Sequence, residues 1–341
     1  MKRSLVMRLL GVCLEMCLIL CLTALPSSAK DVKLTVGAIG TTSDTYMLAM
    51  GWANALKEGK SNVSITPLEG GGTVKLLRGL ITNRWDIGFI GSPHFANALA
   101  GELNFDKDSA ELREQYKKVR TLFGVLTGMA MYVVRGDSTI KTIIDLKGRK
   151  MGIGSPGGMA GLVTRRLFNA HGLSADNNDY SVQYLEYGTA LDEMRSNLLD
   201  GTLLWGSVPQ SGAFNFSRQI PIRFLPIDKD NFEKFRSDMP QGQYYMLKEL
   251  SPEVLKVAYG EGNTVQDSPA NMWGFQMMVI VREDMPEDVA YEITSQFWEH
   301  LDSVKKTAAG LESIDPKEAL TLLSAEFHPG ALKYYKEKGW L

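Results

Sequence analysis

The stretch from residue 63 to residue 95 strongly limits how this chain can fold. Val63–Leu68 has the composition of a strand, and the three glycines 70–72 separate it from a segment with apolar residues at helical spacing. Residues 86–90 are typical of a second, buried strand, which Gly91-Ser92-Pro93 closes as a loop. This order predicts a parallel β-α-β unit, so both loops lie at one edge of the sheet. That carboxyl edge is where open α/β sheets bind ligands.

The first 29 residues have the features of a secretory signal peptide. Lys2, Arg3 and Arg8 precede an apolar run over 9–25, and Ser27-Ser28-Ala29 has the small side chains of a cleavage site. We therefore expect secretion to the periplasm, with cleavage after Ala29.

Composition excludes several classes of function. The three cysteines all lie in the leader, so the mature chain offers no thiol for disulfides, catalysis or metal binding. Loss of the leader removes three basic residues and one acidic residue, which changes the formal charge from −2 to −4. No basic tract indicates nucleic-acid binding. The four histidines lack metal-ligand spacing, so neither a metal nor a cofactor is expected.

Strand, small polar loop and helix follow one another repeatedly along the chain. Residues 32–39 begin the first such set, and residues 149–153 begin a second. Between and after them lie two long apolar runs, 121–134 and 272–282, which are typical of strands that leave one domain and enter the next.

These patterns predict an α/β fold of two domains joined by a two-strand hinge. Domain I is expected to comprise residues 30–127 and 271–341, and domain II residues 128–270, after a signal peptide over 1–29. A ligand would lie in the cleft between the domains, and closure would move them as rigid bodies.

Several motifs, in this order along the chain, resemble the TAXI proteins, which are the solute receptors of TRAP (tripartite ATP-independent periplasmic) transporters. The resemblance covers about Val32 to Trp340 and implies a type II periplasmic-binding-protein fold. It further implies capture of a small organic solute and delivery to TRAP permease membrane subunits driven by an ion gradient. The motifs are GxxGTTSDTYMLAMGWANAL, LEGGGTVKLLRGLITNRWDIGFI, IIDLKGRKMGIGSPGGMAG and HPGALKYYKEKGW.

Five loops supply the candidate ligand contacts. Hydroxyls and amides at a helix start can hold a carboxylate, aided by the helix dipole, although Ser43 or Asp44 can equally be an ordinary N-cap. Three successive glycines exceed what a plain turn needs, and Thr73 is expected to cap the helix after them. The candidates are Thr41, Thr42, Ser43, Tyr46, Gly70, Gly71, Thr73, Gly91, Ser92, His94, Ser155, Gly157, Gly158, Met159, Tyr187, Trp205, Ser207 and Gln210.

Some candidates have an equally plausible structural role. His94 can be a packed histidine, and Tyr187 and Trp205 can belong to the core rather than to a cleft wall. If the ligand is an anion, Arg165 is the arginine we expect to reach it.

The leading hypothesis is a non-catalytic, monomeric receptor for a small organic solute that carries a carboxylate. A receptor for an ABC importer or a ligand-sensing partner of a membrane kinase would share the fold and the binding mode. An enzymatic function is disfavoured by the mature sequence. It contains no cysteine and no pattern of metal ligands, and no Ser, His and Asp residues come together in neighbouring loops. Asp44 and Glu69 are a candidate carboxylate pair, but Glu69 alternates with buried strand positions and is expected to be solvated.

Overall fold

The computed structural model describes residues 31–41, 43–126, 128–154 and 159–341. The predicted signal peptide lies outside these ranges. Lys33–Leu341 forms one unit by its internal contacts, and it contains two separate β-sheets.

The first sheet has five strands in the order β2-β1-β3-β12-β4. Strands β1 and β3 pair in parallel, as expected, whereas β12 runs antiparallel to both of its neighbours, β3 and β4. β12 lies between two strands that come from the first part of the chain. The strands are β1 (Val32–Ala38), β2 (Val63–Glu69), β3 (Ile87–Gly91), β4 (Val119–Val125) and β12 (Met277–Arg282).

The second sheet has seven strands, with six in the order β10-β11-β5-β8-β6-β7 and β9 paired to β5. Strands β6, β7 and β8 are parallel to one another, and the pairs of β5 are antiparallel. The strands are β5 (Met129–Arg135), β6 (Lys150–Gly152), β7 (Ser181–Gln183), β8 (Gly201–Gly206), β9 (Ile222–Phe224), β10 (Met246–Leu250) and β11 (Ala270–Gly274).

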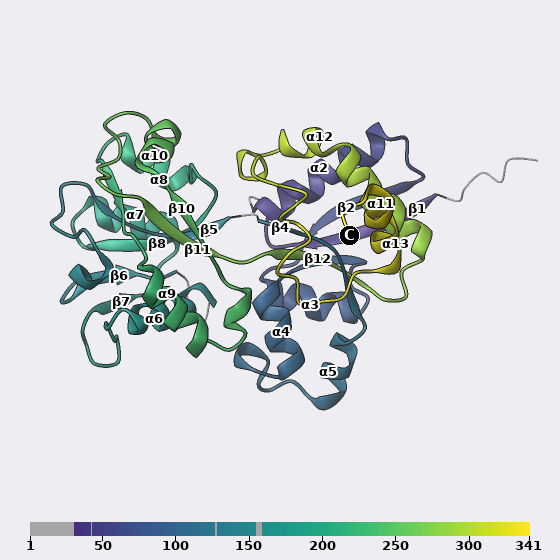
Figure 1. Cartoon of the computed structure of the whole chain (residues 1–341), viewed down its shortest axis with the longest axis horizontal. Helices are drawn as coiled ribbons and strands as arrows, with labels where there is room; N and C mark the ends of the chain where they lie inside the picture. The colour runs from purple at the N-terminus through teal and green to yellow at the C-terminus, as the bar shows by residue number, and fades with distance from the viewer. Residues whose placement is uncertain (1–30, 42, 127, 155–158) are drawn as a thin grey trace, which may run out of the picture. The chain divides into compact units, whose positions relative to one another are not determined.

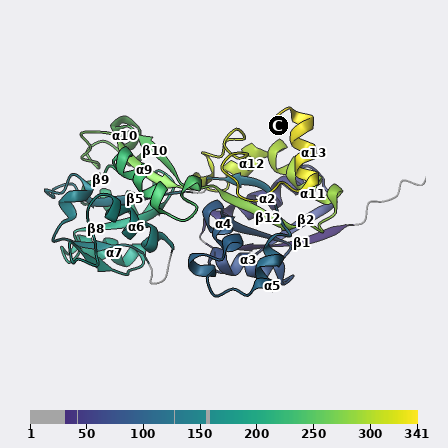
Figure 2. The same cartoon turned by 60° about the horizontal axis from the view of Figure 1, so that its bottom comes forward.

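Helices cover both faces of each sheet. Around the first sheet, α2, α11 and α13 lie on one side, and α3 and α4 lie on the other (Figures 1 and 2). On the second sheet, α7, α8 and α10 supply one core with alternate residues of β5 (Met129, Met131 and Val133). The helices are α2 (Asp44–Glu58), α3 (Thr73–Ile81), α4 (Ser92–Ala100), α5 (Ala110–Tyr116), α6 (Met159–Ala170), α7 (Tyr187–Arg195), α8 (Ser211–Ser217), α9 (Lys229–Asp238), α10 (Pro252–Tyr259), α11 (Glu287–Glu299), α12 (Leu301–Lys305) and α13 (Pro329–Lys338).

The two long apolar runs each change from one sheet to the other. The run at 121–134 supplies β4 to the first sheet and β5 to the second. The run at 272–282 supplies most of β11 to the second sheet and β12 to the first. The predicted boundary between 270 and 271 falls within β11, while the change of sheet occurs at Phe275 and Gln276; the domain limits themselves stay predictions.

Two local predictions were wrong. Gly91-Ser92-Pro93 is not a loop, because α4 starts at Ser92 with Gly91 as N-cap and a proline in its first turn, where proline is well tolerated. Thr73 does not cap α3 but is its first residue, and the N-cap is Gly72. The strand-helix-strand order around them is as expected.

The segment before α13 covers the outer edge of β4. Its backbone accepts hydrogen bonds from Thr121 and Gly124 at 2.8 Å each, through the carbonyls of Glu326 and Ala319. The Gln276 side chain donates to the Glu318 carbonyl at 3.0 Å. The edge strand is therefore not left open for pairing with another chain.

No helix in the described part of the chain has the length and apolar character needed to cross a membrane.

Candidate functional site

The ends of β1, β2 and β3 meet at one edge of the first sheet. The amides of Gly70 and Gly71, just after β2, donate to the carbonyls of Ala38 and Ile39 at the end of β1, at 2.7 and 3.1 Å. The parallel pairing of β1 with β3 brings the start of α4 to the same edge. Three of the predicted loops are thus brought together.

At the first loop, Ser43 is the N-cap of α2. Its hydroxyl accepts from the Tyr46 amide at 3.2 Å and donates to the Gly40 carbonyl at 2.7 Å. The hydroxyl is therefore already used by the helix, which is the structural role that the sequence left open. Thr41 is exposed and Tyr46 is half-buried, whereas Thr42 lies outside the described residues.

The three glycines of the second loop have three different environments. A methyl group on Gly70 would lie 2.9 Å from Trp85 Cη2, so this position is closed by packing. Gly71 has φ +88°, which favours glycine, and Gly72 has no atom within 4 Å of a built Cβ. Only Gly72 borders open space.

The N-terminus of α3 beside Gly72 lacks a side-chain cap. No hydrogen bond within the described residues uses the amides of Thr73, Val74 or Lys75. The Lys75 side chain folds back over the loop, with its Cδ 3.2 Å from a Cβ built on Gly71. Unused amides, the positive end of the helix dipole and an ammonium group together favour an anion here.

The candidates at the third loop are buried. Ser92 is fully buried and donates through its backbone amide and its hydroxyl to the Gln276 carbonyl, at 2.9 and 3.1 Å. His94 is 5% exposed, and its ring lies 4.8 Å from the ring of Phe275. A methyl group on Gly91 would lie 2.5 Å from the same Phe275 ring. These residues contact the crossing between β11 and β12.

On the second sheet, Tyr187 begins α7 beside the end of β6. Its ring lies 3.7 Å from a Cβ built on Gly154, and burial raises the pKa of its hydroxyl to about 12. Met159 is the first residue of α6 and is half-buried. The predicted contacts Ser155, Gly157 and Gly158 lie outside the described residues.

The last predicted loop has an aromatic part, Trp205, which lies within β8, and a polar part that follows the strand. Gln210 caps α8 by accepting from the Ala213 amide at 2.7 Å, and Ser207 is half-buried. Trp205 contacts the rings of Phe275 and Trp273, with centroid distances of 5.1 and 5.5 Å. Its role is therefore at least partly structural, as the core alternative anticipated.

Phe275 is the centre of an aromatic cluster that joins residues of both sheets. His94 belongs to α4, the helix that follows β3 of the first sheet. Trp205 belongs to β8 of the second sheet, and Tyr245 directly precedes β10 of that sheet. Both ring nitrogens of His94 and the hydroxyl of Tyr245 are buried without a hydrogen-bond partner. Burial lowers the pKa of His94 to about 4, so this imidazole is neutral at physiological pH.

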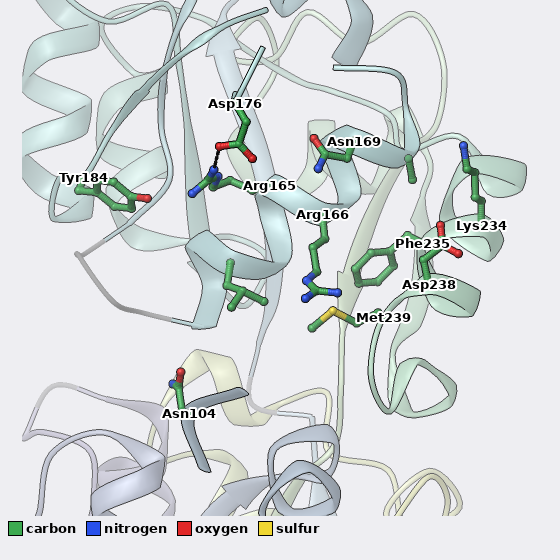
Figure 3. A pocket seen from close by; sticks show the side chains of 12 residues that line it. Asn104, Arg165, Arg166, Asn169, Asp176, Tyr184, Lys234, Phe235, Asp238 and Met239 are labelled. Atoms are coloured by element: carbon green, nitrogen blue, oxygen red, sulfur yellow. Dashed lines mark hydrogen bonds and ion pairs between the residues drawn. The ribbon is translucent and has the colours of Figure 1, made fainter. Parts of the chain in front are cut away.

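A cavity of about 660 Å³ lies between α6 and α9 (Figure 3). The sequence interpretation missed its α9 side, because it assigned no helix over residues 229–238. Asp228, which caps α9, and the i,i+3 pair Phe232 and Phe235 were the available signals for this helix. The cavity is lined by Asn104, Leu162, Arg165, Arg166, Asn169, Ala170, Asp176, Tyr184, Lys234, Phe235, Asp238 and Met239.

Two adjacent arginines of α6 line this cavity, and they differ in their partners. Arg165, the arginine predicted to reach a ligand, forms an ion pair with Asp176. No hydrogen bond or ion pair within the described residues is made by the side chain of Arg166. Arg165 is thus partly neutralised, and Arg166 is not.

The described residues contain no group of three or more His, Cys, Asp or Glu side chains able to hold a metal ion. Asp44 and Glu69 contact different parts of the chain. The Asp44 carboxylate lies 2.8 Å from a Cβ built on Gly310, and Glu69 Oε1 lies 3.7 Å from one built on Gly40.

Comparison with known proteins gives the fold and the family. A TctC solute-binding protein from Polaromonas, crystallised without ligand, superposes with a TM-score of 0.51 at 10% identity, covering 92% of this chain and 100% of that chain. SsuA, the periplasmic aliphatic sulphonate binding protein from Escherichia coli, gives 0.45 at 16% identity over 84% of each chain. A TRAP periplasmic solute-binding protein from Pseudomonas aeruginosa with bound L-malate gives 0.43 at 12% identity over 91% of each chain. The last two likenesses, with TM-scores below 0.5, are too weak to define the fold.

The first likeness and the two covered sheets confirm the predicted fold class, a mixed α/β, two-domain periplasmic-binding-protein fold. The model of the NMT1-like family matches residues 36–339, nearly the whole described chain. The chain belongs to the NMT1-like family.

Proposed function

We propose that this protein is a periplasmic solute receptor of the TAXI type that captures a small organic acid and delivers it to a TRAP permease. The observation that carries the proposal is the N-terminus of α3. Its first three amides have no partner among the described residues, and Lys75 folds over the adjoining loop. A carboxylate bound there would satisfy those amides and face a positive charge.

The pattern of helix caps supports an anionic ligand. At the edge of the first sheet where the three predicted loops meet, α3 and α4 have no side-chain cap, whereas α2 is capped by Ser43. Helices α5, α9 and α10, which start elsewhere, are capped by Ser109, Asp228 and Ser251. Missing caps at ligand-facing ends leave amide donors for a guest.

The first experiment identifies the ligand. The mature chain, purified without denaturation, is examined by native mass spectrometry for a bound acid, and binding of that acid is then measured by calorimetry. The variant Gly72→Leu adds bulk where a built Cβ meets no atom within 4 Å, so it should block binding while the chain still folds, with only the small cost of a poorer N-cap. Thr66→Leu, at an exposed position of β2, is the control and should bind normally.

Unchanged affinity in Gly72→Leu would contradict the site at α3. Turnover of the bound acid by the purified protein would contradict a receptor without catalytic activity. The neighbouring genes distinguish the transport systems: a permease with many membrane spans supports the TRAP assignment, and an ATPase supports an ABC importer.

A further inference from the structure

The cavity between α6 and α9 has features that the proposed receptor site does not use. Its volume of about 660 Å³ is in the range of small-molecule sites. Phe235 and Met239, which are 1% and 4% exposed, form an apolar part of the wall. Leu162 and Ala170 of α6 add further apolar lining.

The charges of the cavity do not cancel. Arg165 and Asp176 neutralise each other as an ion pair. Among the other lining residues, Arg166 and Lys234 are cationic and only Asp238 is anionic, which leaves an excess of one positive charge. No ion pair within the described residues joins Lys234 or Asp238 to another side chain.

Arg166 is placed to meet a ligand in this cavity. In Figure 3 its side chain lies beside those of Phe235 and Met239, whereas Arg165 points toward Asp176. Behind Phe235, at a centroid distance of 5.4 Å, lies Tyr245, whose hydroxyl is buried without a hydrogen-bond partner. Arg166 is exposed, so water satisfies its guanidinium, and its donors are available to an anionic ligand that displaces this water.

We propose that the α6–α9 cavity is a second binding site, for an amphiphilic organic acid whose carboxylate pairs with Arg166 and whose apolar body packs on Phe235 and Met239. Guanidinium and carboxylate match in geometry and can form two parallel hydrogen bonds. None of the residues that line the cavity belongs to the N-terminus of α3, and the proposal does not depend on the proposed receptor function.

The test uses two probes of equal shape. Phenylacetate carries the carboxylate and an aromatic body, and phenylacetamide lacks only the charge. Both are titrated into the full mature chain and followed by calorimetry. The expected result is binding of phenylacetate and at least 10-fold weaker binding of phenylacetamide.

Variants locate the site. Arg166→Gln is expected to weaken phenylacetate binding at least 10-fold, and Arg166→Lys, which keeps the charge, to weaken it less. Arg218→Gln removes an exposed arginine that does not line the cavity, so it is the control and should change the affinity less than 3-fold. Circular dichroism and thermal unfolding establish that each variant is folded.

Several results would overturn the proposal. They are no phenylacetate binding by the wild-type chain at millimolar concentration, equal binding of phenylacetamide, and wild-type affinity in Arg166→Gln. The Gly72→Leu variant separates the two sites, because it should keep phenylacetate binding. Loss of phenylacetate binding in Gly72→Leu would assign the probe to the α3 site instead.

Discussion

His94 is a buried imidazole in an aromatic environment with no hydrogen-bond partner for either nitrogen. Burial lowers its pKa from 6.5 to about 4, because the charged form would lose its hydration. Between these values the unfolded chain binds a proton that the folded chain does not. This group's contribution to stability is therefore present above pH 6.5 and is lost as the pH falls toward 4.

We predict that the unfolding free energy of the wild-type chain decreases by up to about 3 kcal/mol from this group alone as the pH is lowered through that range. His171 and His328 have pKa values lowered by burial and add a loss of the same sign. Urea titrations at several pH values, with His94→Leu as comparison, measure the share of His94. If the unfolding free energies of the two proteins changed equally with pH, the pKa of His94 would not be lowered in the folded chain.

Asp44 should change the pH dependence of stability in the opposite direction to His94. Its carboxyl, half-buried against Gly310, has a pKa raised by burial from 3.8 to about 6. The folded chain therefore takes up a proton before the unfolded chain does, so this group adds stability as the pH falls from 6 toward 4.

We predict that Asp44→Asn raises the unfolding free energy at pH 7.5 by on the order of 1 kcal/mol, since it removes a partly desolvated charge. Near pH 4 the gain should vanish, because the wild-type carboxyl is then protonated in the folded state. Urea titrations at the two pH values test this. An equal change in the unfolding free energy at both pH values would show that burial does not destabilise the charged carboxylate.

Gly70 and Gly72 allow a matched comparison within one loop. A methyl group on Gly70 would lie 2.5 Å from Leu76 Cδ2, which is closer than atoms can approach, whereas one on Gly72 meets nothing within 4 Å. We predict that Gly70→Ala lowers the unfolding free energy by about 1–3 kcal/mol through overpacking. Gly72→Ala should lower it by less than about 1 kcal/mol, because alanine is a poorer N-cap than glycine but meets no atom within 4 Å. Equal stabilities in urea titrations would contradict the packing of Leu76 and Trp85 on this loop.

At the scale of elements, the first strand-helix-strand units could be predicted from the sequence because their patterns are local. Residues 32–39 and 63–68 differ from β1 and β2 by a single residue at the end, and the glycine after Glu58 ends α2 as expected. The two long runs, of fourteen and eleven residues, are assigned to crossings because they exceed the length of an average strand. The sheets to which their halves belong confirm that assignment.

Elements that depend on distant contacts could not be predicted. The first residue of α4, Ser92, is held in place by its amide and hydroxyl, which both donate to the carbonyl of Gln276, 184 residues away. The need for glycine at position 70 arises from the ring of Trp85, which packs against this loop only in the folded chain. The partner that distinguishes Arg165 from Arg166 is likewise visible only in the structure.

For the whole molecule, the segment before α13 protects the first sheet. We predict that replacing residues 315–326 by a Gly/Ser linker of equal length lowers the unfolding free energy by about 3 kcal/mol, given the backbone and side-chain hydrogen bonds it makes to β4 and Gln276. The exposed edge of β4 should also cause association that increases with protein concentration. Urea titration and sedimentation velocity measure the two effects.

A shorter, five-residue Gly/Ser linker that replaces loop residues 174–178 is the control for added flexibility. A variant that stays monomeric at all concentrations would show that the segment does not shield the strand.

The position of β12 has a consequence for how the chain is made. Strands β3 and β4 are not neighbours until residues 277–282 lie between them, so the first sheet cannot be completed while the ribosome is still translating the second. During translation, β3 and β4 therefore remain without their shared neighbour until β12 has been synthesised. Assembly of this sheet is therefore a long-range, late event, and a chain released before residue 282 has no means of closing it.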